Sequence, residues 1–125
     1  MKWLIEFCDE FACEFDDMPE AVQDELLAQL IMLERFGHAL GRPRVDTLNC
    51  SKFANLKELR FKADGGIWRV AFAFDPQRKA IVLVAGDKAG KNEKRFYRVL
   101  IESAEERFER HLSGLSMEVG DGEVT

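Results

Sequence analysis

The sequence predicts an α+β domain, in which a small, mainly antiparallel sheet packs against an N-terminal helix and C-terminal helices. Two stretches with alternating apolar residues, 56–63 and 66–75, flank an Asp-Gly pair that is typical of a two-residue hairpin turn. Residues 80–85 are apolar on both faces, as in an interior strand. Helical apolar spacing recurs on both sides of this region, at 20–36 and 93–112.

The composition indicates one soluble globular domain. The chain has 125 residues, of which 46% are hydrophobic and 33% are charged. No apolar stretch reaches the length of a membrane span, and the first residues lack the pattern of a signal peptide. We therefore expect a cytoplasmic protein without a membrane partner.

The three cysteines, Cys8, Cys13 and Cys50, form no Cys-x-x-Cys pair, and their number is odd. We expect reduced thiols, and neither a metal site nor another cofactor.

Charge is distributed unevenly along the chain. Residues 1–36 carry two basic and ten acidic side chains, residues 37–98 fourteen and six, and residues 99–125 two and seven. The middle segment therefore has a net charge of +8, although the whole chain has −5. A positive middle segment favours an anionic partner, whereas simple mixing of these charges on the folded surface is the alternative.

The N-terminal third is expected to contain a strand and a helix. Residues 3–7 alternate like a strand, and an acidic loop should follow them. Asp17 is the expected helix cap, and Val22, Leu26, Leu30 and Leu33 then recur at helical spacing until Gly37 ends the helix.

The C-terminal third is expected to be helical. Residues 45–53 should be irregular or form one short extended piece before the hairpin. After the interior strand, Asn92 can cap a helix. A second capping box at Ser103 predicts a break near Glu102 and a separate helix over 103–112. We assign 1–112 to the domain and 113–125 to a disordered acidic tail.

The hairpin carries the strongest functional hypothesis. A turn at Asp64 and Gly65 places Arg60 directly opposite Arg69, with the aromatic residues on the other face. Like charges that face each other across a sheet destabilise it, so an anion such as phosphate is expected between them. The alternative is a pair of solvated arginines, each bridged to Glu58 or another acid.

A second basic cluster follows the interior strand. It comprises Lys88, Lys91, Lys94, Arg95 and Arg98, and Glu93 is the one acid within it. This composition favours contact with an RNA backbone over an ordinary solvated helix face. Trp3 and Trp68 lie on apolar faces, and we expect them in the core rather than stacked on bases.

The segment from LKELRF through IWRVAFAFDPQRKAIVLVAGDKAGKNEKRFY resembles the RelE/HigB superfamily of toxins from type II toxin–antitoxin modules, in its phage-derived HigB-like branch. The resemblance covers roughly residues 3–112. It implies a RelE-like fold and a metal-independent endoribonuclease that cuts mRNA, in many relatives at the ribosome, and so inhibits translation. In such enzymes the RNA 2′-hydroxyl attacks the adjacent phosphate and leaves a 2′,3′-cyclic phosphate. The implied partners are the ribosome with its mRNA and an antitoxin, often of the helix-turn-helix type.

The resemblance also implies site residues. Arg69 matches the arginine that binds the scissile phosphate, Arg60 a neighbouring anion contact, and Lys88 a group that stabilises developing charge. Tyr97 lies where relatives keep an aromatic or general-acid residue. The expected RNA contacts are Lys57, Lys62, Lys91, Lys94, Arg95 and Arg98.

The chain departs from some relatives in its histidines. His38 lies beside a helix stop, and His111 lies at the end of the last expected helix, where its interaction with the helix dipole is a sufficient structural role. No general base is therefore evident. Two other functions stay open: a ParE-like toxin that binds DNA gyrase and needs no phosphate site, and a non-catalytic module that binds an antitoxin.

Overall fold

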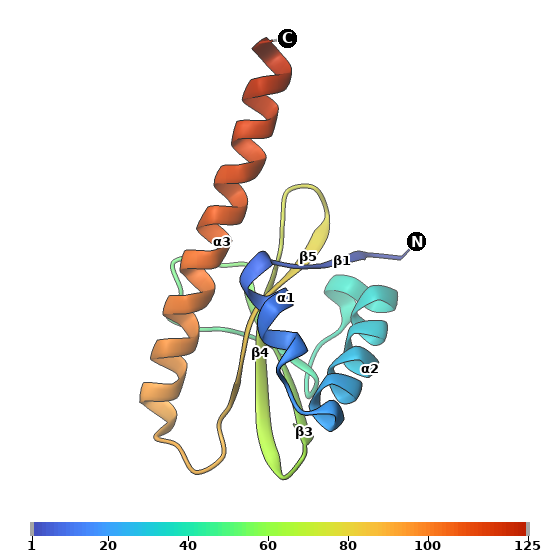
Figure 1. Cartoon of the computed structure of the whole chain (residues 1–125), viewed down its shortest axis with the longest axis vertical. Coiled ribbons are helices and arrows are strands. Elements are labelled where there is room, and N and C mark those ends of the chain that lie inside the picture. Colours follow the sequence, from blue (N-terminus) through green and yellow to red (C-terminus); the bar gives the residue numbers. More distant parts are fainter. Residues whose placement is uncertain (1, 125) are drawn as a thin grey trace.

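The computed structural model describes the backbone of residues 2–124 and the side chains of residues 2–116. Its centre is a five-stranded sheet in the order β1-β5-β4-β3-β2 (Figure 1). Neighbouring strands are antiparallel except for β1 and β5, which are parallel. The strands are β1 (Leu4–Phe7), β2 (Val45–Thr47), β3 (Leu56–Ala63), β4 (Gly66–Phe74) and β5 (Lys79–Asp87).

The predicted hairpin of β3 and β4 is confirmed with its register. Asp64 and Gly65 have φ values of 51° and 72°, and two successive positive values are those of a type I′ turn. Arg60 pairs with Arg69, and Phe61 pairs with Trp68. The turn therefore places the two arginines side by side on one face of the sheet.

Helices cover both faces of the sheet. On one face lie α1 (Asp9–Asp16) and α2 (Glu20–Phe36), whose buried Phe11, Leu26 and Leu33 pack on the side that carries Val70 and Phe72. The short 3-10 helix η1 (Gly37–Ala39) follows α2. On the other face lies α3 (Glu93–Val124), which Figure 1 shows as a long rod beside the sheet. The α3 side chains Leu100, Ala104 and Phe108 form a second core with the sheet.

The acidic loop predicted after the first strand is wrong, because residues 9–16 form α1. Phe11 is fully buried and packs against Phe7 and Phe15, so tertiary burial favours a helix here. Asp9 and Glu10 in the first turn also complement the helix dipole. The cap predicted at Asp17 is wrong as well: Asp17 ends α1, and α2 begins after Pro19.

The break predicted near Glu102 is also wrong. Leu100, Ala104 and Phe108 are buried on one continuous stripe, and this stripe keeps the helix intact across Ser103. Asn92 does cap α3, since its side-chain oxygen accepts a hydrogen bond of 2.9 Å from the Arg95 backbone N–H. In the structure α3 continues to Val124, over the stretch that the sequence assigns to a disordered tail.

The remaining elements agree with the sequence. Gly37, at φ 51°, ends α2, and its Cα lies so close to the Trp3 ring that a Cβ there would clash with it. Trp3 and Trp68 both pack against the core on the α2 side. Within residues 2–124, no helix is long and apolar enough to cross a membrane.

Candidate RNA-cleavage site

The sheet face under α3 carries a polar cluster among apolar neighbours. Glu58 and Arg60 come from β3, Arg69 comes from β4, and Tyr97 comes from the second turn of α3. Strand alternation brings the first two to one face, and the hairpin register adds Arg69. Ala71 pairs with Glu58 in the register, and this small side chain leaves room for the longer ones.

Glu58 is the centre of this cluster. Its Oε1 atom accepts hydrogen bonds of 3.0 Å from Arg60 Nε and 3.0 Å from the Tyr97 hydroxyl, and it lies 3.3 Å from Arg69 Nε. Only 5% of the Glu58 side chain is exposed, and buried carboxylates are stable only when they are paired in this way. Glu58 therefore holds both arginines and the tyrosine in one arrangement.

The two arginines differ in exposure. The Arg69 side chain is 11% exposed, and it donates hydrogen bonds to the Tyr97 hydroxyl and to the Trp68 carbonyl. The Arg60 side chain is 35% exposed and also lies 3.8 Å from Asp46. Burial lowers the pKa of Arg60, but the charge of Glu58, the interactions with Tyr97 and the charge of Asp46 together outweigh it and raise that pKa overall. Arginine side chains stay protonated in proteins, so both are cations, and Arg60 is the more accessible of the two.

Lys88 lies at the edge of the cluster. Its Nζ atom is 5.7 Å from the centre of the Tyr97 ring and 3.0 Å from Glu93 Oε1. The hydrogen bond from Lys88 lowers the pKa of Glu93, whose side chain is 70% exposed. Because Glu93 is so exposed, an incoming phosphate can replace it as the partner of Lys88.

A cleft opens beside these groups between the β2–β3 region and α3. Its volume is about 220 Å³, and we call it the arginine cleft. It is lined by Asp46, Thr47, Leu48, Asn49, Glu58, Arg60, Glu93, Tyr97 and Ile101. Arg69 does not line the cleft itself, but it contacts two residues that do, Tyr97 and Glu58. The arrangement offers two arginines for a phosphate, a lysine for a second charge, and a phenol hydrogen-bonded to a carboxylate for proton transfer.

The other predicted RNA contacts divide into three groups. Lys62, Lys94 and Arg98 are exposed, and Lys62 lies two residues from Arg60 on the same face of β3. Lys57 lies on the opposite face, where its Nζ atom donates a hydrogen bond to Thr47. Lys91 and Arg95 line a different cavity on the far side of α3.

The two histidines lie outside the arginine cleft. His38 packs against the rings of Trp3 and Phe74 on the α2 side. His111 Nε2 lies 2.8 Å from the buried Asp75 carboxylate. The expected position of His111 at a helix end is wrong, because α3 continues beyond it.

From the sequence, Glu58 has no predicted role beyond that of an acid that bridges to the arginines. Its position two residues before Arg60 places it on the same face of the strand, and that spacing is visible in the sequence. Its contact with Tyr97 joins residues 39 apart in the chain and depends on how α3 packs.

The family model for phage-derived Gp49-like proteins matches residues 13–109. The chain belongs to this family. The chain is 51% identical over 82 residues to the protein named "Putative toxin HigB3" from Mycobacterium tuberculosis. The match covers 66% of this chain and 69% of that protein. The protein named "Putative toxin HigB2" from the same organism is 45% identical over 89 residues, which are 70% of this chain but 44% of HigB2.

A solved structure shows the same fold. It is a mutant of the toxin RelE from E. coli in the free state, with a TM-score of 0.56 and 12% identity over 81% of this chain and 95% of that one. Together these matches confirm the resemblance to the RelE/HigB superfamily and the predicted RelE-like α+β fold.

Proposed function

We propose that this protein is the toxin of a type II toxin–antitoxin module and a metal-independent endoribonuclease that cleaves mRNA, at the ribosome, and so inhibits translation. The observation that carries the proposal is the convergence of Arg60, Arg69 and Tyr97 on Glu58 beside an open cleft. The family membership and the toxin names of the relatives support it. The proposed partners are mRNA, the ribosome and an antitoxin of the helix-turn-helix type.

The proposed reaction assigns a role to each group. Arg60 and Arg69 bind the scissile phosphate and stabilise the charge that develops on its oxygens. The 2′-hydroxyl attacks the phosphorus and gives up its proton to the Tyr97 oxygen, while the Tyr97 proton passes to Glu58. The bond to the 5′ oxygen breaks, and Lys88 stabilises and protonates this leaving group. The products are a 2′,3′-cyclic phosphate and a new 5′-hydroxyl end.

The exposed cations next to the cleft are proposed to bind the flanking RNA. Lys62, Lys94 and Arg98 lie on or beside the α3 side of the sheet, and all three are exposed. Contacts of this kind position the backbone and depend on salt concentration. The requirement for a 2′-hydroxyl selects RNA over DNA.

Expression of the chain alone, followed by mapping of RNA 5′ ends, tests the proposal. We expect growth arrest, loss of translation and new 5′ ends within coding regions. Arrest with intact transcripts would contradict the nuclease and favour a gyrase-binding toxin, for which Arg69→Ala should stay toxic. Normal growth would favour a non-catalytic antitoxin-binding module.

A further inference from the structure

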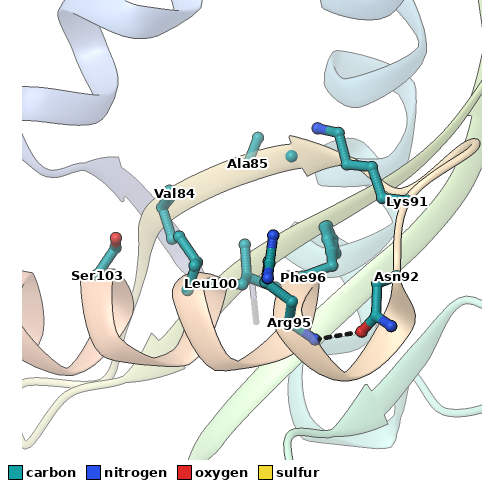
Figure 2. Close-up of a pocket in the computed structure, with 10 residues that line it drawn as sticks. Val84, Ala85, Lys91, Asn92, Arg95, Phe96, Leu100 and Ser103 are labelled. Atoms are coloured by element: carbon teal, nitrogen blue, oxygen red, sulfur yellow. Dashed lines mark hydrogen bonds between the residues drawn. The ribbon is translucent and has the colours of Figure 1, made fainter.

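A second cavity lies on the opposite side of α3 from the arginine cleft. Its volume is about 520 Å³, more than twice that of the cleft. Figure 2 shows it between the last part of β5 and the first turns of α3, with side chains from both elements directed into it. We call it the β5 groove, and it is lined by Val84, Ala85, Gly86, Lys91, Asn92, Arg95, Phe96, Val99, Leu100 and Ser103.

The groove runs along a strand edge that has no neighbour in residues 2–124. The pairing of β1 with β5 ends at Val82, opposite Phe7. The next carbonyl, that of Leu83, is occupied by the Arg107 guanidinium and the Cys8 thiol. From Val84 to Asp87, β5 therefore pairs with β4 along one edge, and its other edge has no partner strand within residues 2–124. A free strand edge of this kind is a template for another extended chain.

The walls and the rim of the groove differ in character. Val84, Phe96 and Val99 supply an apolar wall, and the Val99 side chain is 54% exposed although it is large and apolar. Lys91 and Arg95 supply positive charge at the rim, where Lys91 Nζ lies 5.8 Å from the Phe96 ring centre. None of the lining residues is acidic. Apolar side chains with interspersed carboxylates are therefore complementary to this surface.

We propose that the β5 groove binds an extended segment of a partner protein that carries apolar and acidic side chains. The segment pairs with the β5 edge along residues 84–87, places its apolar side chains against Val99 and Phe96, and faces its carboxylates to Lys91 and Arg95. Strand addition to a sheet edge is a common mode of peptide recognition. We assign Lys91 and Arg95 to this segment and not to RNA, because both line the β5 groove, on the opposite side of α3 from the arginine cleft.

A capped ten-residue peptide in which valine alternates with glutamate tests this proposal. Titrated into the purified ¹⁵N-labelled chain, it should shift the amide resonances of residues 84–87 and 95–99 and protect the β5 amides from hydrogen exchange. Val99→Glu should weaken binding at least tenfold. Ile31→Glu is the matched control, because Ile31 is also an exposed apolar residue on a helix, 65% accessible, but lies on the other face of the molecule. The Ile31→Glu variant should bind the peptide as tightly as the original protein does.

A second variant, Lys91→Glu with Arg95→Glu, should weaken binding through charge without changing the apolar wall. Unshifted β5 resonances, equal binding of a valine–lysine peptide, or equal affinities of the Val99 and Ile31 variants would overturn the proposal. The proposal would also be overturned if a uridine oligonucleotide shifted these resonances and the peptide did not. The readout involves no RNA cleavage, so failure of the proposed nuclease leaves this result unaffected, and the reverse also holds.

Discussion

Glu58 determines how the other residues of the arginine cleft are arranged. One of its oxygens contacts Arg60, Arg69 and Tyr97, and its side chain is nearly inaccessible. Glu58 thus offsets part of the positive charge of the arginine pair before any anion binds. The bridging to Glu58 that the sequence left as an alternative is therefore present, and anion binding by the two arginines stays a prediction.

Replacing Tyr97 with phenylalanine should separate chemistry from structure. The variant keeps the ring under Lys88 but removes the hydroxyl that links Arg69 to Glu58. If this hydroxyl transfers a proton, RNA cleavage should fall by roughly 10²- to 10⁴-fold. The loss of folding stability should be about 1 kcal/mol. Single-turnover cleavage and urea unfolding measure the two quantities, and unchanged cleavage would remove Tyr97 from the mechanism.

At the level of elements, the hairpin was predictable because its determinants are local. The Asp-Gly turn fixes the register, and the register fixes the Arg60–Arg69 pair. The helix α1 was not predictable from its acidic composition, because it forms through burial of Phe11 against residues of β1. The local capping box at Ser103 was overridden by the apolar stripe of α3 in the same way.

The short strand β2 supplies an acid-sensitive contact. Hydrogen bonds from the Arg42 side chain and the Thr47 backbone N–H lower the pKa of Asp46 below its ordinary value of 3.8. The unfolded chain therefore binds this proton more readily than the folded one. The contribution of Asp46 to stability is complete above this value and is lost as the pH falls through the folded-state pKa.

Asp46→Asn should therefore flatten the pH dependence of stability. Between about pH 5 and about pH 3, the free energy of unfolding should fall less steeply in the variant than in the original protein. Urea denaturation at a series of pH values measures this slope. Glu93→Gln should have an additive effect, since its pKa is lowered by a different partner, Lys88. Identical slopes in all three proteins would show that folding does not lower the pKa of either carboxylate.

For the whole molecule, the position of α3 determines which residues come together in the arginine cleft and where the β5 groove opens. Tyr97 reaches Glu58, and the β5 groove opens on the opposite side, only because α3 lies along the sheet. The parallel pairing of β1 with β5 and the docking of α3 join residues far apart in sequence, and periodicity does not reveal such contacts. The predicted arginines and Tyr97 therefore converge as expected, whereas Lys57, Lys91 and Arg95 do not join them.

Arg107 fixes α3 to the rest of the molecule. Its guanidinium donates to both oxygens of Glu14 on α1, at 2.7 and 2.6 Å, and to the Leu83 carbonyl at 2.7 Å. Arg107→Ala should cost about 1.5–3 kcal/mol of stability, because it leaves Leu83 without this charged donor. Arg110→Ala removes a more exposed ion pair on the same helix and should cost less than about 1 kcal/mol. Urea unfolding compares the two variants, and equal losses of stability would contradict the role of Arg107 in fixing α3.

The most direct test of the central claim compares Arg69→Ala with Lys57→Ala. Both variants remove a cation from the central hairpin, but Arg69 contacts Glu58 and Tyr97 beside the arginine cleft, whereas Lys57 lies on the opposite face of the sheet. The measurement is the rate at which new RNA 5′ ends appear after expression of each variant. We expect a loss of roughly 10²- to 10³-fold for Arg69→Ala and little change for Lys57→Ala. Full cleavage by Arg69→Ala would contradict this expectation.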